Sequence, residues 1–185
     1  PNFTFATNVA ASFDITAART TIANCNFINA IDAQTAMMNV SAADVIIEDC
    51  EFHLGTLSTP QTLLGILGTA AADRLMVRRN YMHGCITAGN VAAIRVVGSD
   101  FTVIEDNVIV GEFALTGCIS NTGTAATMLI IRRNNLLNRA ATADNKVIVA
   151  DAGTTGLIVH NTFGIIDTAC PVPVTAAAMH VGANW

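Results

Sequence analysis

The chain has 185 residues, of which 52% are hydrophobic and 12% are charged, and its formal net charge is −5. This composition excludes a disordered chain and predicts a single domain spanning residues 1–185. One lysine and eight arginines form no basic stripe, so we expect no nucleic-acid partner. No apolar run reaches the roughly 18 residues that span a bilayer, so we expect no membrane partner either.

The first 18 residues precede any repeat and contain three phenylalanines, Phe3, Phe5 and Phe13. We interpret residues 1–18 as an N-terminal cap or docking segment, because large aromatic side chains at the end of a domain are costly to expose. At the other end, residues 167–185 form the C-terminal end of the domain and include the only tryptophan, Trp185.

Six copies of one eight-residue pattern lie between these ends, and their central residues are 25 to 30 positions apart. Each copy has an aliphatic residue three positions before the centre and a large apolar residue two positions after it. The copies read TTIANCNF, VIIEDCEF, LMVRRNYM, TVIEDNVI, LIIRRNNL and GLIVHNTF, centred on Cys25, Cys50, Asn80, Asn107, Asn134 and Asn161. A period of this length is typical of stacked supersecondary units.

The two residues before each centre alternate in charge from copy to copy. In order they are Ala23-Asn24, Glu48-Asp49, Arg78-Arg79, Glu105-Asp106, Arg132-Arg133 and Val159-His160. If the copies are parallel strands in register, about 4.8 Å apart, each acidic pair lies beside an arginine pair. A slip of one copy would place like charges together, so we interpret this charged ladder as a device that sets the register.

A second, weaker apolar segment follows each copy, and clusters of Gly, Ser, Thr, Asn and Asp separate the segments. These segments are 37–40, 63–67, 92–97, 117–120, 146–149 and 178–181. Within each copy, one residue more than strict alternation allows lies between the two apolar positions, so the strand must bend there. An inward Asn at such a bend can bond backbone groups of its own turn and of the next, which predicts a stacked asparagine ladder.

The repeated pattern [VL]-x-[IV]-x-x-N-x-[FIML] resembles that of the right-handed parallel β-helix in the pectate-lyase-like superfamily, over roughly residues 13–183. The resemblance implies an all-β solenoid of about six or seven rungs. It implies little about activity, because that superfamily includes polysaccharide lyases, polysaccharide hydrolases, phage tailspikes and non-catalytic surface proteins.

An enzymatic role would require a carboxylate site, for which Glu48, Asp49, Glu105 and Asp106 are the candidates. Arginines interleaved between them should lower their pKa values and occupy their oxygens, which suits a structural ladder better than a general acid. We therefore assign no catalytic residue. A binding or catalytic surface at the ladder stays the alternative interpretation.

Metal and cofactor sites have little support in the sequence, so we assign none. Asp44, Asp73 and Asp100 stand six or seven residues before three successive centres and could stack to hold Ca²⁺, although Asp is equally common at tight turns. His53 and His83 should be neighbours on adjacent rungs, without a third ligand, and His160 and His180 have no evident partner.

The five cysteines are odd in number and show no metal-binding spacing, so we expect buried free thiols rather than a disulfide framework. Cys25 and Cys50 occupy positions where Asn stands in later copies, and a bridge between them is conceivable because neighbouring rungs are close.

These observations, with the resemblance, favour a non-enzymatic structural protein of a bacteriophage virion, assembled in the host cytoplasm. We expect a capsid decoration, cement or spike protein whose partners are other virion proteins and copies of itself, with a trimer the first arrangement to test. The alternative function is a polysaccharide lyase, hydrolase or polysaccharide-binding β-helix such as a tailspike fragment. A third interpretation is a bacterial surface or adhesin repeat domain, which the lack of a visible signal peptide disfavours.

Overall fold

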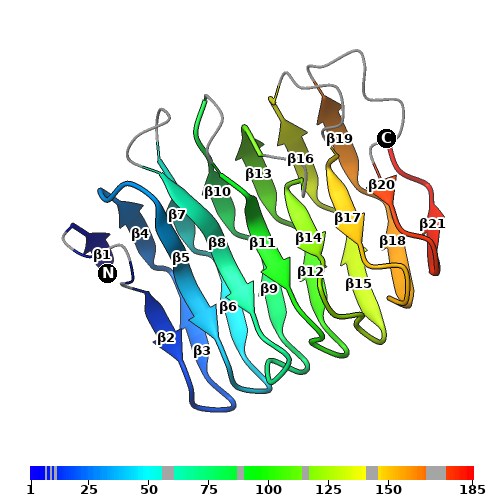
Figure 1. Cartoon of the computed structure of the whole chain (residues 1–185), viewed down its shortest axis with the longest axis horizontal. Helices are drawn as coiled ribbons and strands as arrows, with labels where there is room; N and C mark the ends of the chain where they lie inside the picture. Colours follow the sequence, from blue (N-terminus) through cyan, green and yellow to red (C-terminus); the bar gives the residue numbers. More distant parts are fainter. Residues whose placement is uncertain are drawn as a thin grey trace.

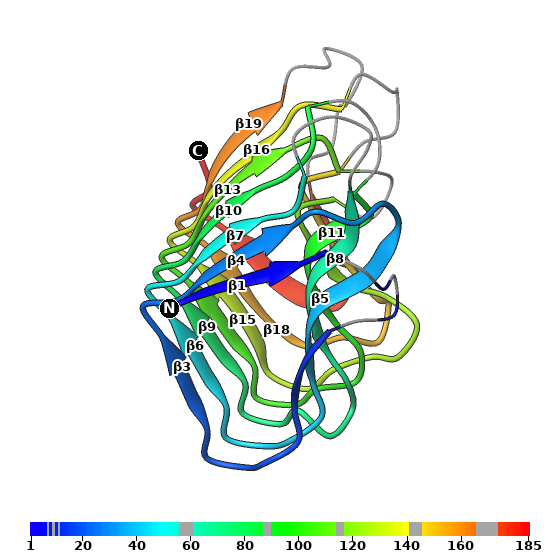
Figure 2. The same ribbon diagram turned by 90° about the vertical axis from the view of Figure 1, so that its left-hand side faces the viewer.

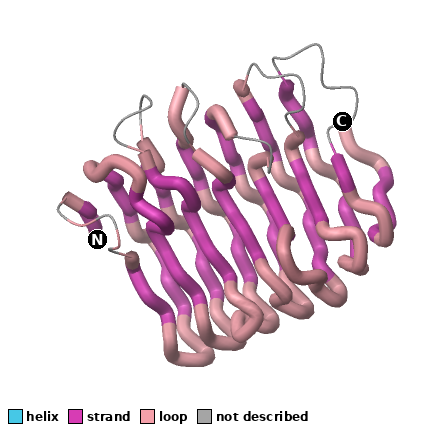
Figure 3. Tube along the Cα trace, viewed as in Figure 1, coloured by secondary structure: helices cyan, strands magenta, loops and turns pink. Residues whose placement is uncertain are grey.

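The computed structural model describes residues 1–6, 8, 10, 12–55, 61–86, 90–113, 117–140, 146–165 and 174–185. These residues form strands and loops without any helix (Figure 3). It follows that no helix in the described part of the chain is long and apolar enough to cross a membrane.

The strands form three parallel sheets of seven strands each (Figure 1). Sheet A contains β1 (Asn2–Phe5), β4 (Asn26–Asn29), β7 (Glu51–His53), β10 (Tyr81–His83), β13 (Val108–Gly111), β16 (Asn135–Asn138) and β19 (Thr162–Ile165). Sheet B contains β2 (Phe13–Ile15), β5 (Gln34–Val40), β8 (Thr62–Gly68), β11 (Ala92–Val96), β14 (Ile119–Asn121), β17 (Ile148–Ala150) and β20 (Val174–Thr175). Sheet C contains β3 (Thr21–Ala23), β6 (Ile46–Glu48), β9 (Met76–Arg78), β12 (Val103–Glu105), β15 (Leu129–Arg132), β18 (Gly156–Val159) and β21 (Met179–Gly182).

The chain visits sheets A, B and C in turn, and each strand pairs with its counterpart one turn earlier and one turn later. Seen from the N-terminal end, it runs clockwise from β4 through β5 to β6 as it recedes (Figure 2). That winding is right-handed, as the connections of parallel strands almost always are. The predicted right-handed parallel β-helix of six or seven rungs is therefore confirmed.

The predicted register is also confirmed. Glu48 pairs with Arg78, Arg78 with Glu105, and Glu105 with Arg132, so the charged ladder runs through consecutive strands of sheet C. Successive side chains of a strand point to opposite faces of the sheet, so the aliphatic residue before each outward charged residue points into the core. Ile47, Val77, Ile104, Ile131 and Ile158 are accordingly buried in the core.

The core is a column of stacked apolar layers, one from each turn. At the N-terminal end Phe27 stacks on Phe3, with ring centroids 5.1 Å apart, and on Phe52, with centroids 4.9 Å apart. Phe13 packs edge-on against Phe3 and Phe27. The segment 1–18, interpreted as a cap or docking segment, thus contributes ordinary strands β1 and β2 to the solenoid, and its aromatic side chains extend the core.

Each turn bends sharply between sheet C and sheet A, as the sequence predicts. The residue before each centre adopts the left-handed conformation, with φ between 53° and 56° at Asn24, Asp49, Arg79, Asp106, Arg133 and His160. One left-handed residue turns the chain without breaking the pairing of its neighbours. We call these six residues the bend column.

The C-terminal end corrects one prediction. Residues 178–181, expected to be another second segment, instead belong largely to β21 in sheet C, where Val181 pairs with Ile158. The second segment of that turn is β20 in sheet B. Asn184 is therefore a seventh centre, preceded by Ala183 with a φ of 42°.

Candidate functional site

The asparagine ladder lies on the inner side of the bend and joins successive turns through side-chain amides. Asn107 Oδ1 accepts hydrogen bonds from the backbone N and from Nδ2 of Asn80, both at 3.0 Å. Asn107 Nδ2 donates to Asn134 Oδ1 and to the carbonyl of Val77. The same bonds recur at Asn134 and Asn161, and the last of them reach Asn184.

Cysteine takes this position in the first two copies. Cys50 Sγ lies 3.7 Å from the carbonyl oxygen of Ile22, which corresponds to the bond from Asn80 Nδ2 to the Ile47 carbonyl. Both Cys25 and Cys50 are free thiols, as expected, so the conceivable bridge between them is not formed. Cys85 and Cys118 are free and buried as well, and Cys170 lies outside the described residues.

Burial makes these thiols weak acids. Desolvation raises the pKa of Cys50 to about 11 and that of Cys85 to about 11, and it raises the pKa of Cys118 further still. A thiol attacks or binds metal as the thiolate, so these three groups are poor nucleophiles at neutral pH.

On the outer side of the bend, the charged ladder resolves into two closed clusters. In the first, Arg79 grips Asp49 through two hydrogen bonds, Nε to Oδ1 at 2.9 Å and Nη2 to Oδ2 at 2.8 Å. Glu48 Oε2 accepts from Arg78 Nε at 2.7 Å and from Arg79 Nη2 at 2.8 Å. Two carboxylates of one turn are thus held by two guanidinium groups of the next.

The second cluster repeats this geometry two turns later. Arg133 binds Asp106 through Nε and Nη2, both at 2.8 Å, while Arg132 Nε and Arg133 Nη2 converge on Glu105 Oε2 at 2.7 and 2.9 Å. Glu105 is the more buried of the two glutamates, with 10% of its side chain exposed against 18% for Glu48. Because an unpaired buried charge is costly, the neighbouring arginines stabilise the buried Glu105 carboxylate.

The arginines lower the pKa values of three ladder carboxylates, those of Glu48, Asp49 and Asp106, as predicted. The hydrogen bond from Arg78 lowers the pKa of Glu48, that from Arg79 lowers the pKa of Asp49, and that from Arg133 lowers the pKa of Asp106. A general acid in glycosidic cleavage needs a raised pKa, so the lowered pKa values of Glu48, Asp49 and Asp106 do not suit these three groups to that role.

The three aspartates considered for Ca²⁺ do not stack as one group. The expectation that Asp44, Asp73 and Asp100 lie in one column is therefore wrong. Asp44 aligns with Arg74, whose Nε and Nη2 donate to its two carboxylate oxygens at 2.5 and 3.0 Å. The hydrogen bond from Arg74 lowers the pKa of Asp44. Asp73 and Asp100 instead accept from backbone N–H groups of the next turn, those of Asp100 and Thr127.

His53 and His83 are neighbours on β7 and β10, as predicted. His53 Nε2 lies 3.0 Å from Glu51 Oε1 on the same strand. His160 occupies the bend column, and His180 lies on β21 in register with Leu157. Within the described ranges, no group of three or more His, Cys, Asp or Glu side chains is placed to hold a metal ion.

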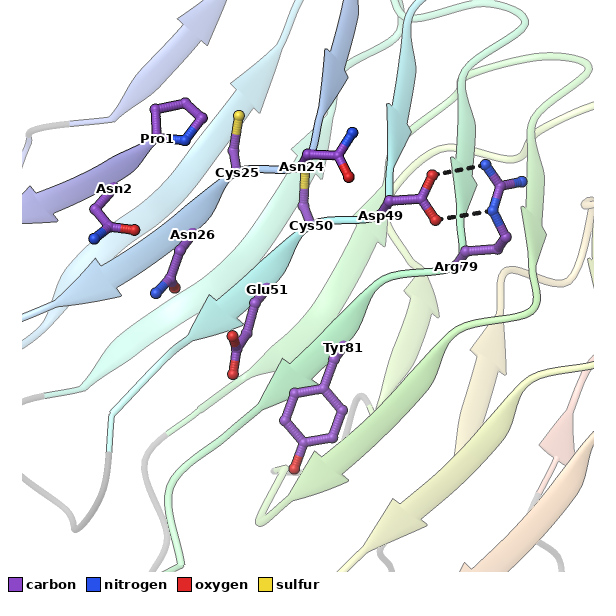
Figure 4. Close-up of a pocket in the computed structure, with 10 residues that line it drawn as sticks. All are labelled: Pro1, Asn2, Asn24, Cys25, Asn26, Asp49, Cys50, Glu51, Arg79 and Tyr81. Atoms are coloured by element: carbon purple, nitrogen blue, oxygen red, sulfur yellow. Dashed lines mark hydrogen bonds and ion pairs between the residues drawn. The ribbon is translucent and has the colours of Figure 1, made fainter.

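A shallow, open depression of about 600 Å³ lies over the bend near the N-terminus (Figure 4). Figure 4 shows Asn26, Glu51 and Tyr81 projecting from sheet A on one side, and the sulfur atoms of Cys25 and Cys50 pointing the other way. The two dashed contacts in that view join Asp49 to Arg79, so these two charged residues of the lining are paired with each other.

Comparison of the chain with family models, curated proteins and solved structures gives no match. None of these comparisons supports the pectate-lyase-like resemblance, which rests on the repeated sequence pattern alone.

The structure also contains a feature that sequence analysis missed, a second column of left-handed residues between sheets B and C. These residues have φ between 57° and 60° and are Arg19, Asp44, Arg74, Phe101 and Met128. We call them the turn column. The signal available in the sequence was their constant position, six residues before each centre. The residue type at that position changes in nearly every copy, so the position does not stand out.

Proposed function

We propose that the protein is a non-enzymatic structural component of a bacteriophage virion, a capsid decoration, cement or spike protein that docks on a larger assembly. The observation that carries the proposal is the closure of the two charged clusters. Every carboxylate of the ladder is bound by arginines of the adjacent turn, so the polar groups that a β-helix enzyme would direct at a substrate serve here to hold turn upon turn.

The inner side of the bend supports the same role. The asparagine amides bond successive turns to each other, and the buried thiols are held as weak acids. A solenoid locked on both sides of the bend is a rigid rod. Rigidity of this kind suits a spacer or a clamp on a particle surface. Assignment to a phage rests on the resemblance of the repeated pattern to that superfamily.

The proposal is tested on purified particles. Antibodies raised against the recombinant chain should label virions from the source of the sequence, and quantitative mass spectrometry should find the chain in fixed stoichiometry with the major capsid or tail protein. Its absence from particles purified to constant composition contradicts the proposal.

The alternative, a polysaccharide lyase or hydrolase, is tested in parallel. Acidic and neutral polysaccharides are incubated with the chain, with and without Ca²⁺, and new reducing ends and unsaturated products are measured. The proposal expects no turnover. Turnover that disappears in Glu105→Gln, with the fold retained, would establish the enzyme instead and would locate its site in the second cluster.

A further inference from the structure

The outer face of sheet C carries an uninterrupted apolar stripe. Outward positions of five consecutive strands, paired in register, are occupied by Ile46, Met76, Val103, Ile130 and Leu157. Each is half-buried, and each precedes an inward aliphatic residue that is fully buried in the core. We call these five residues the sheet C stripe.

The other two sheets do not share this property. Polar residues interrupt the outward columns of both. The column of sheet A runs Ile28, His53, His83, Val110 and Leu137, and that of sheet B runs Asp14, Asn39, Leu67, Arg95 and Ser120. Polar residues on the outside of a solenoid are the rule, because that face meets water. The sheet C stripe departs from the rule in five turns running.

Two members of the turn column extend the apolar surface. Phe101 and Met128 lie next to the stripe on adjacent turns, with 54% and 48% of their surfaces exposed. Both adopt a left-handed backbone conformation, which is unfavourable for a bulky side chain. Figure 2 shows the outer side of β6, β9, β15 and β18 uncovered by other described segments. Contiguous exposed apolar surface of this kind marks an interaction site.

The charged ladder borders the stripe in four of its five turns, from Glu48-Asp49 beside Ile46 to Arg132-Arg133 beside Ile130, while the fifth turn carries Val159-His160. The order of its charges indicates which partner fits this face. Along the solenoid its sign runs negative, positive, negative, positive, from Glu48-Asp49 on to Arg132-Arg133. A two-fold axis parallel to the strands, passing between β9 and β12, reverses this order in a facing copy. Arg78 then lies opposite Glu105 of that copy, and Glu48 lies opposite its Arg132.

The same operation matches four of the five apolar residues with one another and sets the fifth, Leu157, opposite Thr21 of the facing copy. Met76 meets Val103 of the facing copy, Ile46 meets its Ile130, and Arg74 faces the exposed ring of Phe101, a favourable cation–π pairing. A parallel or three-fold arrangement about an axis along the solenoid would bring equal turns together, acid against acid and arginine against arginine. Like charges in that position are destabilising.

We propose that sheet C is the interface of an antiparallel, two-fold symmetric dimer of this chain. A patch that is complementary to itself under a two-fold axis is what an isologous dimer requires. The apolar stripe forms the centre of the interface, and the two charged clusters form a polar rim that sets the direction. The proposal stands on the surface of sheet C alone and holds whether or not the protein belongs to a virion.

Sedimentation equilibrium tests the association. The wild-type chain is expected to have the mass of a dimer, and Val103→Glu is expected to shift it to the mass of a monomer. Leu137→Glu, an equivalent change on the outer face of sheet A, serves as the matched control and should remain dimeric. Circular dichroism confirms that each variant is folded. A monomeric wild-type chain, or equal loss of the dimer in both variants, overturns the proposal.

Cross-linking tests the orientation without relying on a disruptive substitution. Chains carrying Met76→Cys are mixed with chains carrying Val103→Cys under mild oxidation, with the wild-type chain as the blank for native thiols. The antiparallel dimer predicts a mixed disulfide between the two variants, and likewise between Ile46→Cys and Ile130→Cys chains. Predominant Met76→Cys homodimers would show a parallel interface and would contradict the proposal.

Discussion

Asn107 receives two hydrogen bonds on one oxygen, from the backbone N and the side-chain amide of Asn80, and it is itself only 1% exposed. Removing that oxygen leaves the buried backbone N–H of Asn80 without a partner, and the Asn80 amide keeps only its bond to the Ile47 carbonyl. This relationship makes the asparagine ladder the most sensitive part of the bend.

We predict that Asn107→Ala destabilises the fold strongly, since each buried polar group left without a partner costs about 1–3 kcal/mol. Urea denaturation followed by circular dichroism measures the change in the free energy of unfolding. Asn184→Ala is the matched control, because Asn184 makes the same bonds at the last described turn and is only half-buried. An equal loss in both variants would show that the ladder is not cooperative along the rod.

Reversing one arginine pair tests the charged ladder. Changing Arg78 and Arg79 together to Glu places three acidic pairs on consecutive turns and removes the bonds to Glu48 and Asp49. A clear loss in unfolding free energy is expected at low salt, and the loss should shrink as salt is added. Arg139→Glu with Lys146→Glu makes the same change in net charge outside the clusters. If the unfolding free energy falls by the same amount in both double variants, the change in net charge explains the effect and the pairing in register does not.

Stability should depend on pH through four carboxylates, those of Asp44, Glu48, Asp49 and Asp106. Their pKa values are lowered in the folded state by arginine hydrogen bonds, so the unfolded chain binds more protons at acidic pH. Their stabilising contribution is complete above the ordinary carboxyl values of 3.8 and 4.5 and is lost as the pH falls through the lower folded values. Thermal melts at stepped pH should therefore show a falling melting temperature below about pH 4.5. A melting temperature unchanged down to pH 2 would contradict the pairing.

Left-handed residues other than glycine store strain that can be removed. Ala33 is exposed and has a φ of 55°, so Ala33→Gly should raise stability by roughly 0.5–1 kcal/mol as the strain is relieved. Ala152 is an exposed alanine outside the left-handed set, and its replacement by Gly should lower stability instead. Differential scanning calorimetry of both variants checks the sign. The same sign in both would show that backbone conformation at Ala33 is not the cause.

Sequence alone was sufficient for the repeating parts of the fold. Glu48 and Arg78 indicated the register because opposite charges in adjacent copies make sense only if the copies are stacked, and Asn80 indicated the bend because an inward amide must bond backbone. These signals repeat, and each copy reinforces the others.

The features that were missed do not repeat in residue type. The turn column is defined by backbone conformation, and Asp44, Arg74 and Phe101 have no common side-chain chemistry that could reveal it. For the same reason Asp44 was grouped with Asp73. Asp44 and Arg74 are both left-handed residues of the turn column, so Asp44 aligns with Arg74 instead. The seventh centre, Asn184, was hidden by its shorter spacing of 23 residues and by Gly182 and Ala183 in place of a charged pair.

Copies 27 and 30 residues apart stack in register and are held there by ion pairs of one polarity, each arginine pair binding the acidic pair one turn before it. A double-mutant cycle on Glu105→Gln and Arg132→Gln tests this pairing most directly, with unfolding free energies measured in urea. The expected coupling between Glu105 and Arg132 is close to 1 kcal/mol, the upper end for a partly exposed pair. A second cycle with Arg78→Gln, on the strand at the other side of Glu105, should give a clearly smaller coupling, because the ion pairs of Arg78 run to Glu48. No coupling in the first cycle, or equal coupling in both, would contradict the account.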